Sequence, residues 1–398
     1  MLFAAPRMVM NLADCFFYHT MDIPGYGTVH GNWDIRGNES TYLGDVELND
    51  KRVLEIGPAS GQLTFFMERQ GAKVVSLEAA EDFAWEFFWD LPDSAPEDLG
   101  EKLEAHRAVM EQVRNSFWLC HRAFSSKAEV HYGNAYSVPE QLGMFDVSIL
   151  ACMLLHNKNP LGIIENCARV TQETIIIVEV FQNHPFSHAG MELLQNENRK
   201  SWDTWWGFSP GLFVDVLKTM GLPHHRVTFH TQKCRGKPVG LFTVVASRRP
   251  FADLPTDQAQ IRVKLNCSVE RLRIEANELT FLAVSIVNLG ETPLSSFSTA
   301  PVVLSYHWRQ KSGEVAIWDG IRTSLPRTLS KGDKEDLLLV IQAPVEPGAY
   351  MLEITMLKES VVWYDYKIPG IPLRIETVVT PYNVSSGEAI RHSKSSTP

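Results

Sequence analysis

The chain has 398 residues, of which 44% are hydrophobic and 21% are charged, and its formal net charge is −10. This composition is typical of a folded protein long enough for two domains, and the negative charge argues against long nucleic acids as ligands without excluding a local basic patch. No apolar run reaches about 18 residues, and the six cysteines form no CxxC pair. We therefore expect a cytoplasmic protein without a membrane span, disulfides or a zinc site.

Residues 1–45 form an N-terminal segment whose part at 14–44 is rich in aromatic residues and glycine. No period of 2 or 3.6 persists there, so we expect a short helix and an ordered loop. Arg7 interrupts its apolar start, which argues against a secretory signal. Because the segment precedes the first strand, it is a candidate lid over a ligand site. Trp33 offers an indole face to a cation, and Arg36 offers a clamp for a carboxylate. A packing role for Trp33 and a surface position for Arg36 are the alternatives.

Residues 51–78 predict a buried strand, a glycine-rich turn, an amphipathic helix and a second buried strand. The turn runs from Gly57 to Gly61, and the second strand ends at Glu78. An acid about twenty residues after such glycines is typical of a nucleoside-cofactor site. The glycines let a ligand approach the backbone, and a carboxylate at Glu78 can accept hydrogen bonds from both ribose hydroxyls.

The residues around this turn discriminate between nucleoside cofactors. Pro58 and Ala59 stand where a dinucleotide fingerprint needs its second glycine, and no Gly-Lys-Ser/Thr follows as in a P-loop. Glu55 would repel a pyrophosphate but attract an ammonium group. Carboxylates on both sides of the glycines therefore suit S-adenosylmethionine, which has an amino-acid end and a ribose but no phosphate. A generic α/β unit with a tight turn is the alternative.

The run VLEIGPASGQL…VVSLE resembles the cofactor motif of class I S-adenosylmethionine-dependent methyltransferases. In that family the turn after the third strand carries an acid or amide for the adenine amino group, and the resemblance places Asn134 there, after a strand at 129–132. The residues expected at the cofactor are Trp33, Arg36, Glu55, Gly57, Pro58, Ser60, Gly61, Glu78, Asn134, Ala135 and Cys152.

An insertion at 79–127 carries a predicted helix over 99–123. His106, Arg107, Arg114 and Arg122 recur near helical spacing in it. They either line an acceptor cleft or form a solvated helix face, and we favour the solvated face.

The segments that follow predict a doubly wound α/β sheet, because strands that are continuous in apolar residues alternate with helices. These elements are a strand at 145–151, a helix at 160–169, a strand at 174–180, a helix at 210–221, and strands at 227–232 and 240–246. The last two strands fit a final antiparallel hairpin. We therefore expect a seven-stranded, Rossmann-like methyltransferase domain over residues 46–248.

The candidate catalytic residues follow the central strand and its neighbour. An oxygen acceptor must be oriented against the methyl group and lose its proton, usually to His, Asp or Glu. His156 is the candidate base, with capping of the next loop as the alternative, and Asn157 is expected to position the acceptor. Glu179 is a second candidate base or a helix cap.

The stretch between 180 and 209 is rich in aromatic residues. Trp202 and Trp206 are expected to stack on a planar ring or on the apolar face of a sugar, with sealing of the domain or docking of the following domain as the alternatives. His184 and His188 are separated by a proline and lack an acidic partner, so we propose no metal.

Beyond a polar linker at 249–259, the pattern changes to short alternating strands with regular turn signals. This predicts an antiparallel, immunoglobulin-like β-sandwich over 260–380, followed by a serine-rich, disordered tail at 381–398. The piece PGAYMLEITML resembles the late hairpin of bacterial immunoglobulin-like sandwiches, including carbohydrate-binding modules. The sandwich is expected to bind substrate, recruit a partner or form a homo-oligomer.

Four runs within residues 30–235 resemble the methyltransferase subgroup that includes the tRNA wobble-uridine carboxymethyltransferases: GNWDIRG, VLEIGPASG, FDVSILACMLLHNKNP and WWGFSPGLFVDVLKTMG. Those enzymes bear basic side chains for an extra carboxylate and for tRNA, whereas here only Arg36 lies nearby. The sequence thus predicts O-methylation of a small molecule or glycan with S-adenosylmethionine. The alternatives are an RNA-modifying methyl or carboxymethyl transferase and a non-catalytic cofactor-binding scaffold.

Overall fold

A computed structural model describes residues 2–83, 85–86, 96–181, 189–194, 203–251, 261–297, 301–358, 362–365, 368 and 370–381. The described residues form two compact units, unit 1 up to residue 251 and unit 2 from residue 261. Most of the expected linker and nearly all of the expected tail lie outside the described residues.

Unit 1 is built on one eight-stranded sheet with the order β3-β11-β12-β8-β7-β4-β5-β6. Its strands are β3 (Trp33–Asp34), β4 (Arg52–Ile56), β5 (Lys73–Ala79), β6 (Glu129–Gly133), β7 (Phe145–Ala151), β8 (Thr171–Val180), β11 (His224–Cys234) and β12 (Lys237–Ser247). The strands from β6 to β8 run parallel, and β12 and β11 complete the sheet as an antiparallel hairpin. The predicted doubly wound fold is confirmed, with β3 as an additional edge strand.

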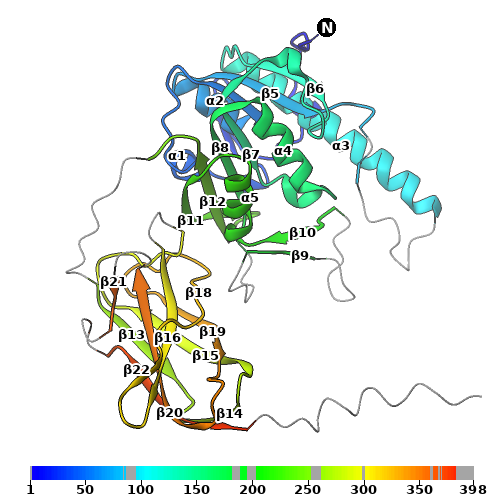
Figure 1. Ribbon diagram of the computed structural model, residues 1–398. Coiled ribbons are helices and arrows are strands. Elements are labelled where there is room, and N and C mark those ends of the chain that lie inside the picture. The colour runs from blue at the N-terminus through cyan, green and yellow to red at the C-terminus, as the bar shows by residue number, and fades with distance from the viewer. Residues whose placement is uncertain are drawn as a thin grey trace, which may run out of the picture. The chain divides into compact units, whose positions relative to one another are not determined.

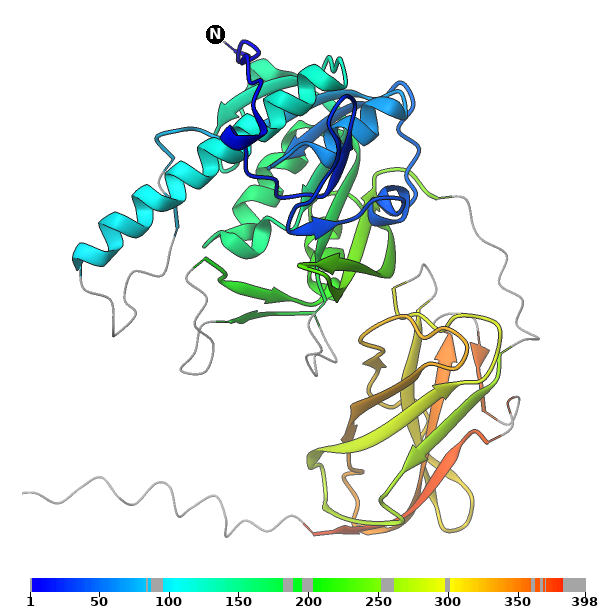
Figure 2. The same ribbon diagram turned by 180° about the vertical axis from the view of Figure 1, so that it is seen from behind.

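The strand order reverses between β4 and β7, so the crossover helices on the two sides of that point cover opposite faces of the sheet. Helices α4 (Pro160–Val170) and α5 (Pro210–Thr219) lie in front of the sheet in Figure 1, and α3 (Pro96–Ala123) lies in front of it in the reverse view of Figure 2. The short helix α2 (Gln62–Arg69) connects β4 to β5.

Two helices begin where the sequence provides both a cap and a proline. The side chain of Asn159 accepts a hydrogen bond from the Gly162 N–H before α4, and that of Ser209 accepts one from the Leu212 N–H before α5. In each case proline is the first helical residue, where its missing N–H costs nothing.

The N-terminal segment has more structure than a short helix and a loop. It contains η1 (Leu12–Asp14), the hairpin of β1 (Met21–Ile23) and β2 (Gly27–Val29), strand β3, and α1 (Glu39–Tyr42). Strand β3 pairs with the end of β11 through Trp33 opposite Cys234. Only two residues pair in this way, which is too short a run to produce a periodic pattern in the sequence. A second small hairpin joins β9 (Met191–Leu193) to β10 (Trp206–Phe208).

Unit 2 contains two sheets whose inner faces share one hydrophobic core. The smaller sheet has the order β13-β15-β19, with β13 (Val263–Cys267), β15 (Leu279–Asn288) and β19 (Lys334–Gln342). The larger has the order β14-β22-β20-β16-β17, with β14 (Arg271–Glu275), β22 (Leu373–Thr380), β20 (Gly348–Lys358), β16 (Val302–Gln310) and β17 (Val315–Ile317). Two short strands extend the larger sheet. Strand β18 (Thr323–Ser324) pairs with β16, and β21 (Val362–Trp363) pairs with β20. The predicted sandwich is confirmed, although β14 and β22 pair in parallel.

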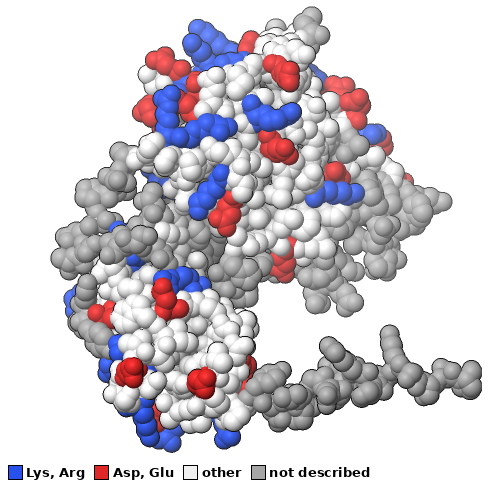
Figure 3. All heavy atoms as spheres, in the orientation of Figure 1, with Lys and Arg blue, Asp and Glu red and all other residues white. Residues whose placement is uncertain are grey.

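Charged side chains of both signs are interspersed on the face seen in Figure 3, and the described residues of that face show no continuous basic stripe. In the described part of the chain, no helix is long and apolar enough to cross a membrane.

Candidate functional site

The glycine-rich turn after β4 lies at a cavity of about 450 Å³ in unit 1, and the turns after β5, β6 and β7 also contribute to its wall. Gly57 has a φ of 71° and Ala59 one of 50°. A Cβ added at Gly57 would come no closer than 3.8 Å to another atom, the Cβ of Met153. The absent side chain therefore leaves the backbone open to the cavity.

Gly61 is required for a different reason. Its φ is 85°, and an added Cβ would lie 2.4 Å from Cε2 of Phe65. Gly61 is not among the residues that line the cavity. The constraint at this position is thus the packing of the turn against Phe65 rather than the approach of a ligand.

Two buried carboxylates border the turn and line the cavity, Glu55 on β4 and Glu78 on β5. Glu55 Oε2 accepts hydrogen bonds from the Thr64 hydroxyl and, at 3.3 Å, from that of Ser76. Burial raises the pKa of Glu55 to about 7 although these hydroxyls oppose the shift. Burial also raises the pKa of Glu78, opposed by the Ala79 N–H, which donates to Oε1 at 2.8 Å. Both groups are poised to gain from a ligand that donates hydrogen bonds or carries positive charge.

The N-terminal segment forms part of the cavity wall through Tyr18, His19 and Trp33. The Tyr18 N–H donates to Ser60 Oγ at 2.7 Å, and the Trp33 N–H donates to the Tyr18 carbonyl at 2.9 Å. Ser60 is fully buried, so its hydroxyl fastens the segment to the turn. Trp33 thus lines the cavity, and its role toward a cofactor stays a prediction.

Arg36 does not line the cavity. Its Nη1 lies 2.7 Å from an Asp22 oxygen, and Nε and Nη2 each lie 2.8 Å from the Asp34 carboxylate. The pKa of Arg36 is raised chiefly by its hydrogen bonds to Asp34. The guanidinium that was expected to bind a ligand carboxylate therefore forms ion pairs with two carboxylates of the protein itself.

After β6, the cavity wall is formed by Gly133 and Ala135, and Asn134 is not part of it. Asn134 Oδ1 accepts a hydrogen bond from the Tyr136 N–H at 2.9 Å. This is a local turn in which an asparagine side chain satisfies the backbone two residues later. The carbonyl that was expected to accept the adenine amino group is thus engaged within the turn.

After β7, Cys152 lines the cavity with a φ of 50°, and its Sγ lies 3.5 Å from the Tyr42 hydroxyl. The chain then forms η3 (Leu154–His156), whose Leu154 N–H donates to Glu179 Oε1 at 3.0 Å. Glu179 is buried outside the cavity wall, and burial raises its pKa to about 8. This geometry favours the capping role for Glu179, because its carboxylate holds the turn that carries His156.

His156 and Asn157 both line the cavity. His156 Nδ1 lies 2.6 Å from the Asp203 carbonyl oxygen, which can only accept a hydrogen bond. Nδ1 therefore carries the proton, and Nε2 of the neutral ring keeps its lone pair. In this tautomer the ring can accept a proton at Nε2. Asn157 Nδ2 donates to the Met153 carbonyl at 2.6 Å, which fixes its amide.

Trp206, on β10, contacts the loop that follows η3 and contains Asn157. Its Nε1 donates to the carbonyls of Asn157 and Lys158 at 3.1 and 3.2 Å, and it does not line the cavity. Trp202, the other expected stacking residue, lies outside the described residues.

Helix α3 contributes His106, which was expected on a solvated face, and two further residues to the cavity wall. His106, Met110 and Val113 line the cavity, whereas Arg107 is exposed beside Glu104. The ring of His106 packs edge-on against Trp85 at 4.5 Å, and burial lowers its pKa. The spacing of 106, 110 and 113 places the three side chains on one helix face, a signal that the sequence contained.

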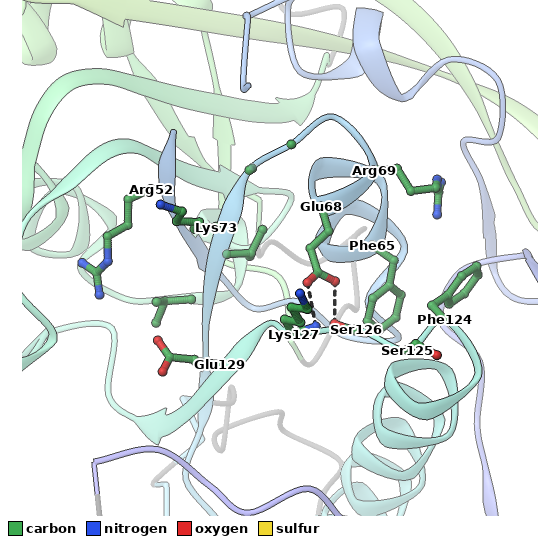
Figure 4. A pocket seen from close by; sticks show the side chains of 14 residues that line it. Arg52, Phe65, Glu68, Arg69, Lys73, Phe124, Ser125, Ser126, Lys127 and Glu129 are labelled. Atoms are coloured by element: carbon green, nitrogen blue, oxygen red, sulfur yellow. Dashed lines mark hydrogen bonds between the residues drawn. The ribbon is translucent and has the colours of Figure 1, made fainter. Parts of the chain in front are cut away.

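A second cavity, of about 670 Å³, lies at the amino ends of β4, β5 and β6. Arg52, Lys73 and Glu129 begin these strands, and Glu68 on α2 accepts hydrogen bonds from the Ser126 hydroxyl and the Lys127 N–H (Figure 4). Ligands of open α/β sheets bind at the carboxyl ends of the strands. The smaller cavity is therefore the candidate functional site.

No protein-family model and no curated protein matches the sequence. Among solved structures, the chain is similar to the N-terminal domain of EvdMO1 in the presence of SAH and D-fucose, with 17% identity, 60% of this chain and 93% of that chain covered, and a TM-score of 0.35. It is also similar to magnesium protoporphyrin IX methyltransferase from Synechocystis PCC 6803 with bound SAH, with 11% identity, 53% and 80% coverage, and a TM-score of 0.34. For a SAM-dependent methyltransferase from Aquifex aeolicus, identity is 13%, coverage 53% and 90%, and the TM-score 0.32. The fold assignment of unit 1 rests on its strand order rather than on these values.

Proposed function

We propose that unit 1 is an S-adenosylmethionine-dependent methyltransferase and that it methylates an oxygen atom of a small molecule or glycan. The observation that carries the proposal is the continuity of the cavity. One cavity is lined both by Glu55, Gly57 and Glu78 and, after the central strand, by His156 and Asn157.

The residues around the glycine-rich turn suit the binding of the cofactor. Glu78 would accept hydrogen bonds from the ribose hydroxyls, and Glu55 would attract the ammonium group of the amino-acid end. Trp33 provides an aromatic wall for a sulfonium. The bound cofactor supplies an activated methyl group.

His156 is the proposed base. His156 Nε2 would take the proton that the acceptor hydroxyl loses on methylation. The resulting imidazolium would still donate a hydrogen bond from Nδ1–H to the Asp203 carbonyl. Asn157 is placed to orient the acceptor. The bulky apolar side chains of the wall, including Trp85 and Met110, exclude water from the transfer.

Calorimetric titration with S-adenosylmethionine tests the first step. Glu78→Ala is expected to weaken binding about tenfold or more, since it removes charge-assisted hydrogen bonds worth about 1.5–3 kcal/mol. Glu140→Ala, at an exposed glutamate on η2 (Glu140–Leu142), is the matched control and should bind as the wild type does. Equal affinity for wild type and Glu78→Ala would refute the ribose assignment.

Transfer of a tritiated methyl group into fractionated extract of the source cells tests the second step. Label in a small metabolite or glycan is expected, and it should be lost with His156→Gln. Label in RNA would replace the proposed acceptor with the nucleic-acid alternative. Tight cofactor binding with no labelled product in any fraction would favour a non-catalytic scaffold.

A further inference from the structure

The larger sheet of unit 2 carries a buried cluster on the face that points away from the core. Along β16, Leu304, Tyr306 and Trp308 belong to the shared core. Side chains alternate along a strand, so His307 projects to the opposite face. That face of a sandwich is normally solvated, yet His307 is only 1% exposed. Residues following β17 and β20 therefore cover it.

Two indoles provide this cover. The Trp318 ring stacks on the His307 imidazole, with centroids 4.0 Å apart and planes 15° apart, and Trp363 lies 4.5 Å from the same imidazole. Trp318 remains 43% exposed. One face of its indole is occupied by His307, so the exposed area belongs to the other face and the edges.

Polar groups border this exposed indole. Trp363 meets Trp318 edge-on at 5.8 Å and 61°, forming a wall beside it. The guanidinium of Arg322 lies 4.9 Å from the Trp363 ring centroid and 2.8 Å from the Asp319 carboxylate. Donors and acceptors thus lie next to an apolar platform.

The cluster also contains a buried carboxylate that is only partly satisfied. Asp365 Oδ2 lies 2.9 Å from His307 Nε2, and the Asp365 side chain is 5% exposed. Within the described part of the chain, Asp365 Oδ1 is buried without a hydrogen-bond partner. The His307–Asp365 pair thus holds the imidazole on which the Trp318 indole stacks.

We propose that this cluster, the Trp318 platform, is a carbohydrate-binding site. A sugar ring presents C–H groups on one face, which pack on an indole, and pairs of hydroxyls at its rim, which match a guanidinium and a carboxylate. A quaternary ammonium ligand is disfavoured, because Arg322 already occupies a position over Trp363. An anionic ligand is disfavoured by Asp319 and Asp365. The site is independent of the methyl transfer proposed for unit 1.

Affinity electrophoresis of the full chain, in gels that contain dextran, mannan, xylan or galactan, tests the proposal. The wild type is expected to be retarded in at least one gel, and Trp318→Ala should weaken the apparent affinity about tenfold or more, as expected for a central tryptophan of a binding site. Phe281→Ala is the matched control, because Phe281 is an exposed aromatic residue on the smaller sheet, at 56% exposure. It should be retarded like the wild type.

Two further variants keep the test decisive. Arg322→Gln removes a rim donor and keeps both tryptophans, and it should weaken retention even if Trp318→Ala proves unstable. Because Arg322 also donates to the Gly320 carbonyl and the Ser305 hydroxyl, its thermal melt is compared with that of the wild type. Glu78→Ala, in the cofactor cavity, should retain full sugar binding, which separates this proposal from the one for unit 1. Absence of retardation in all four gels, or equal retardation of wild type, Trp318→Ala and Arg322→Gln, would overturn the assignment.

Discussion

Replacement of Glu55 by glutamine tests how the cavity recognises the charged end of its cofactor. Glu55 is buried beside the turn, and its pKa is raised to about 7 by burial. At pH 6 the side chain is therefore mostly protonated and neutral, and at pH 8 it is mostly ionised. Only the ionised form attracts an ammonium group, so cofactor affinity in the wild type should rise with pH across this window.

The size of the effect follows from the titration. If binding requires ionised Glu55, only about one molecule in eleven is competent at one pH unit below the pKa, and about ten in eleven at one unit above it. The dissociation constant should thus fall about tenfold between pH 6 and pH 8, which corresponds to about 1.4 kcal/mol. Glu55→Gln keeps the size of the side chain and its acceptor for Thr64, but it cannot ionise.

The assay is calorimetric titration with S-adenosylmethionine at several pH values for both proteins. The ratio of the two affinities at each pH removes any titration of the cofactor itself. This ratio should favour the wild type about tenfold more at pH 8 than at pH 6. A ratio that is constant from pH 6 to pH 8 would refute the role assigned to Glu55.

Four other changes test separate parts of the site. His156→Gln should lower kcat by about 10²–10⁴ with little change in cofactor affinity, whereas the exposed His30→Gln should leave both unchanged, and equal rates for the two variants would exclude His156 as the base. Glu179→Gln should flatten the fall in stability between pH 4.5 and pH 8. Because its raised pKa keeps the proton on the folded state while the unfolded state loses it, the wild type loses about 1.4 kcal/mol of stability per pH unit in this window, and thermal melts of both proteins should converge at low pH. Gly61→Ala should destabilise by about 1–3 kcal/mol more than Gly236→Ala, because both have positive φ but only the first meets an atom within 4 Å, and equal melting temperatures would contradict the packing argument. Arg36→Gln should leave cofactor affinity within about threefold, since Asp22 and Asp34 already bind the guanidinium, and a larger loss in titration would restore its predicted role.

The parts of the site that the sequence predicts best are those that lie within one short stretch of chain. Gly57, Glu55 and Glu78 belong to a single strand–turn–helix–strand unit. Its two strands are parallel neighbours, so all three residues lie at the carboxyl edge of the sheet. His156 could be placed for the same reason, because it follows the central strand. Its tautomer could not, since that depends on the carbonyl of Asp203, which is 47 residues away in the sequence.

The residues that proved hardest to place are polar groups with competing local partners. Asn134 is in the right turn, but its carbonyl is satisfied by the Tyr136 N–H, and Arg36 is in the right segment, but it pairs with Asp22 and Asp34. A sequence motif records the residue type and the spacing but not these rival hydrogen bonds. His106 is the opposite case, because its helical spacing with Met110 and Val113 marked a buried face that its charged neighbours obscured.

The pairing of β3 with β11 has a practical consequence for how this protein can be produced. Strand β11 would otherwise end with unpaired backbone groups at Lys233 and Cys234, and β3 covers them with Trp33 and Asp34. A shortened chain that begins after residue 36 would open this sheet edge to association between copies, and it would also lack part of the cavity wall. The truncation would also remove the buried side chains of Phe17, Met21 and Ile35 from the core. Loss of solubility would therefore reflect newly exposed apolar surface as well as the open strand edge.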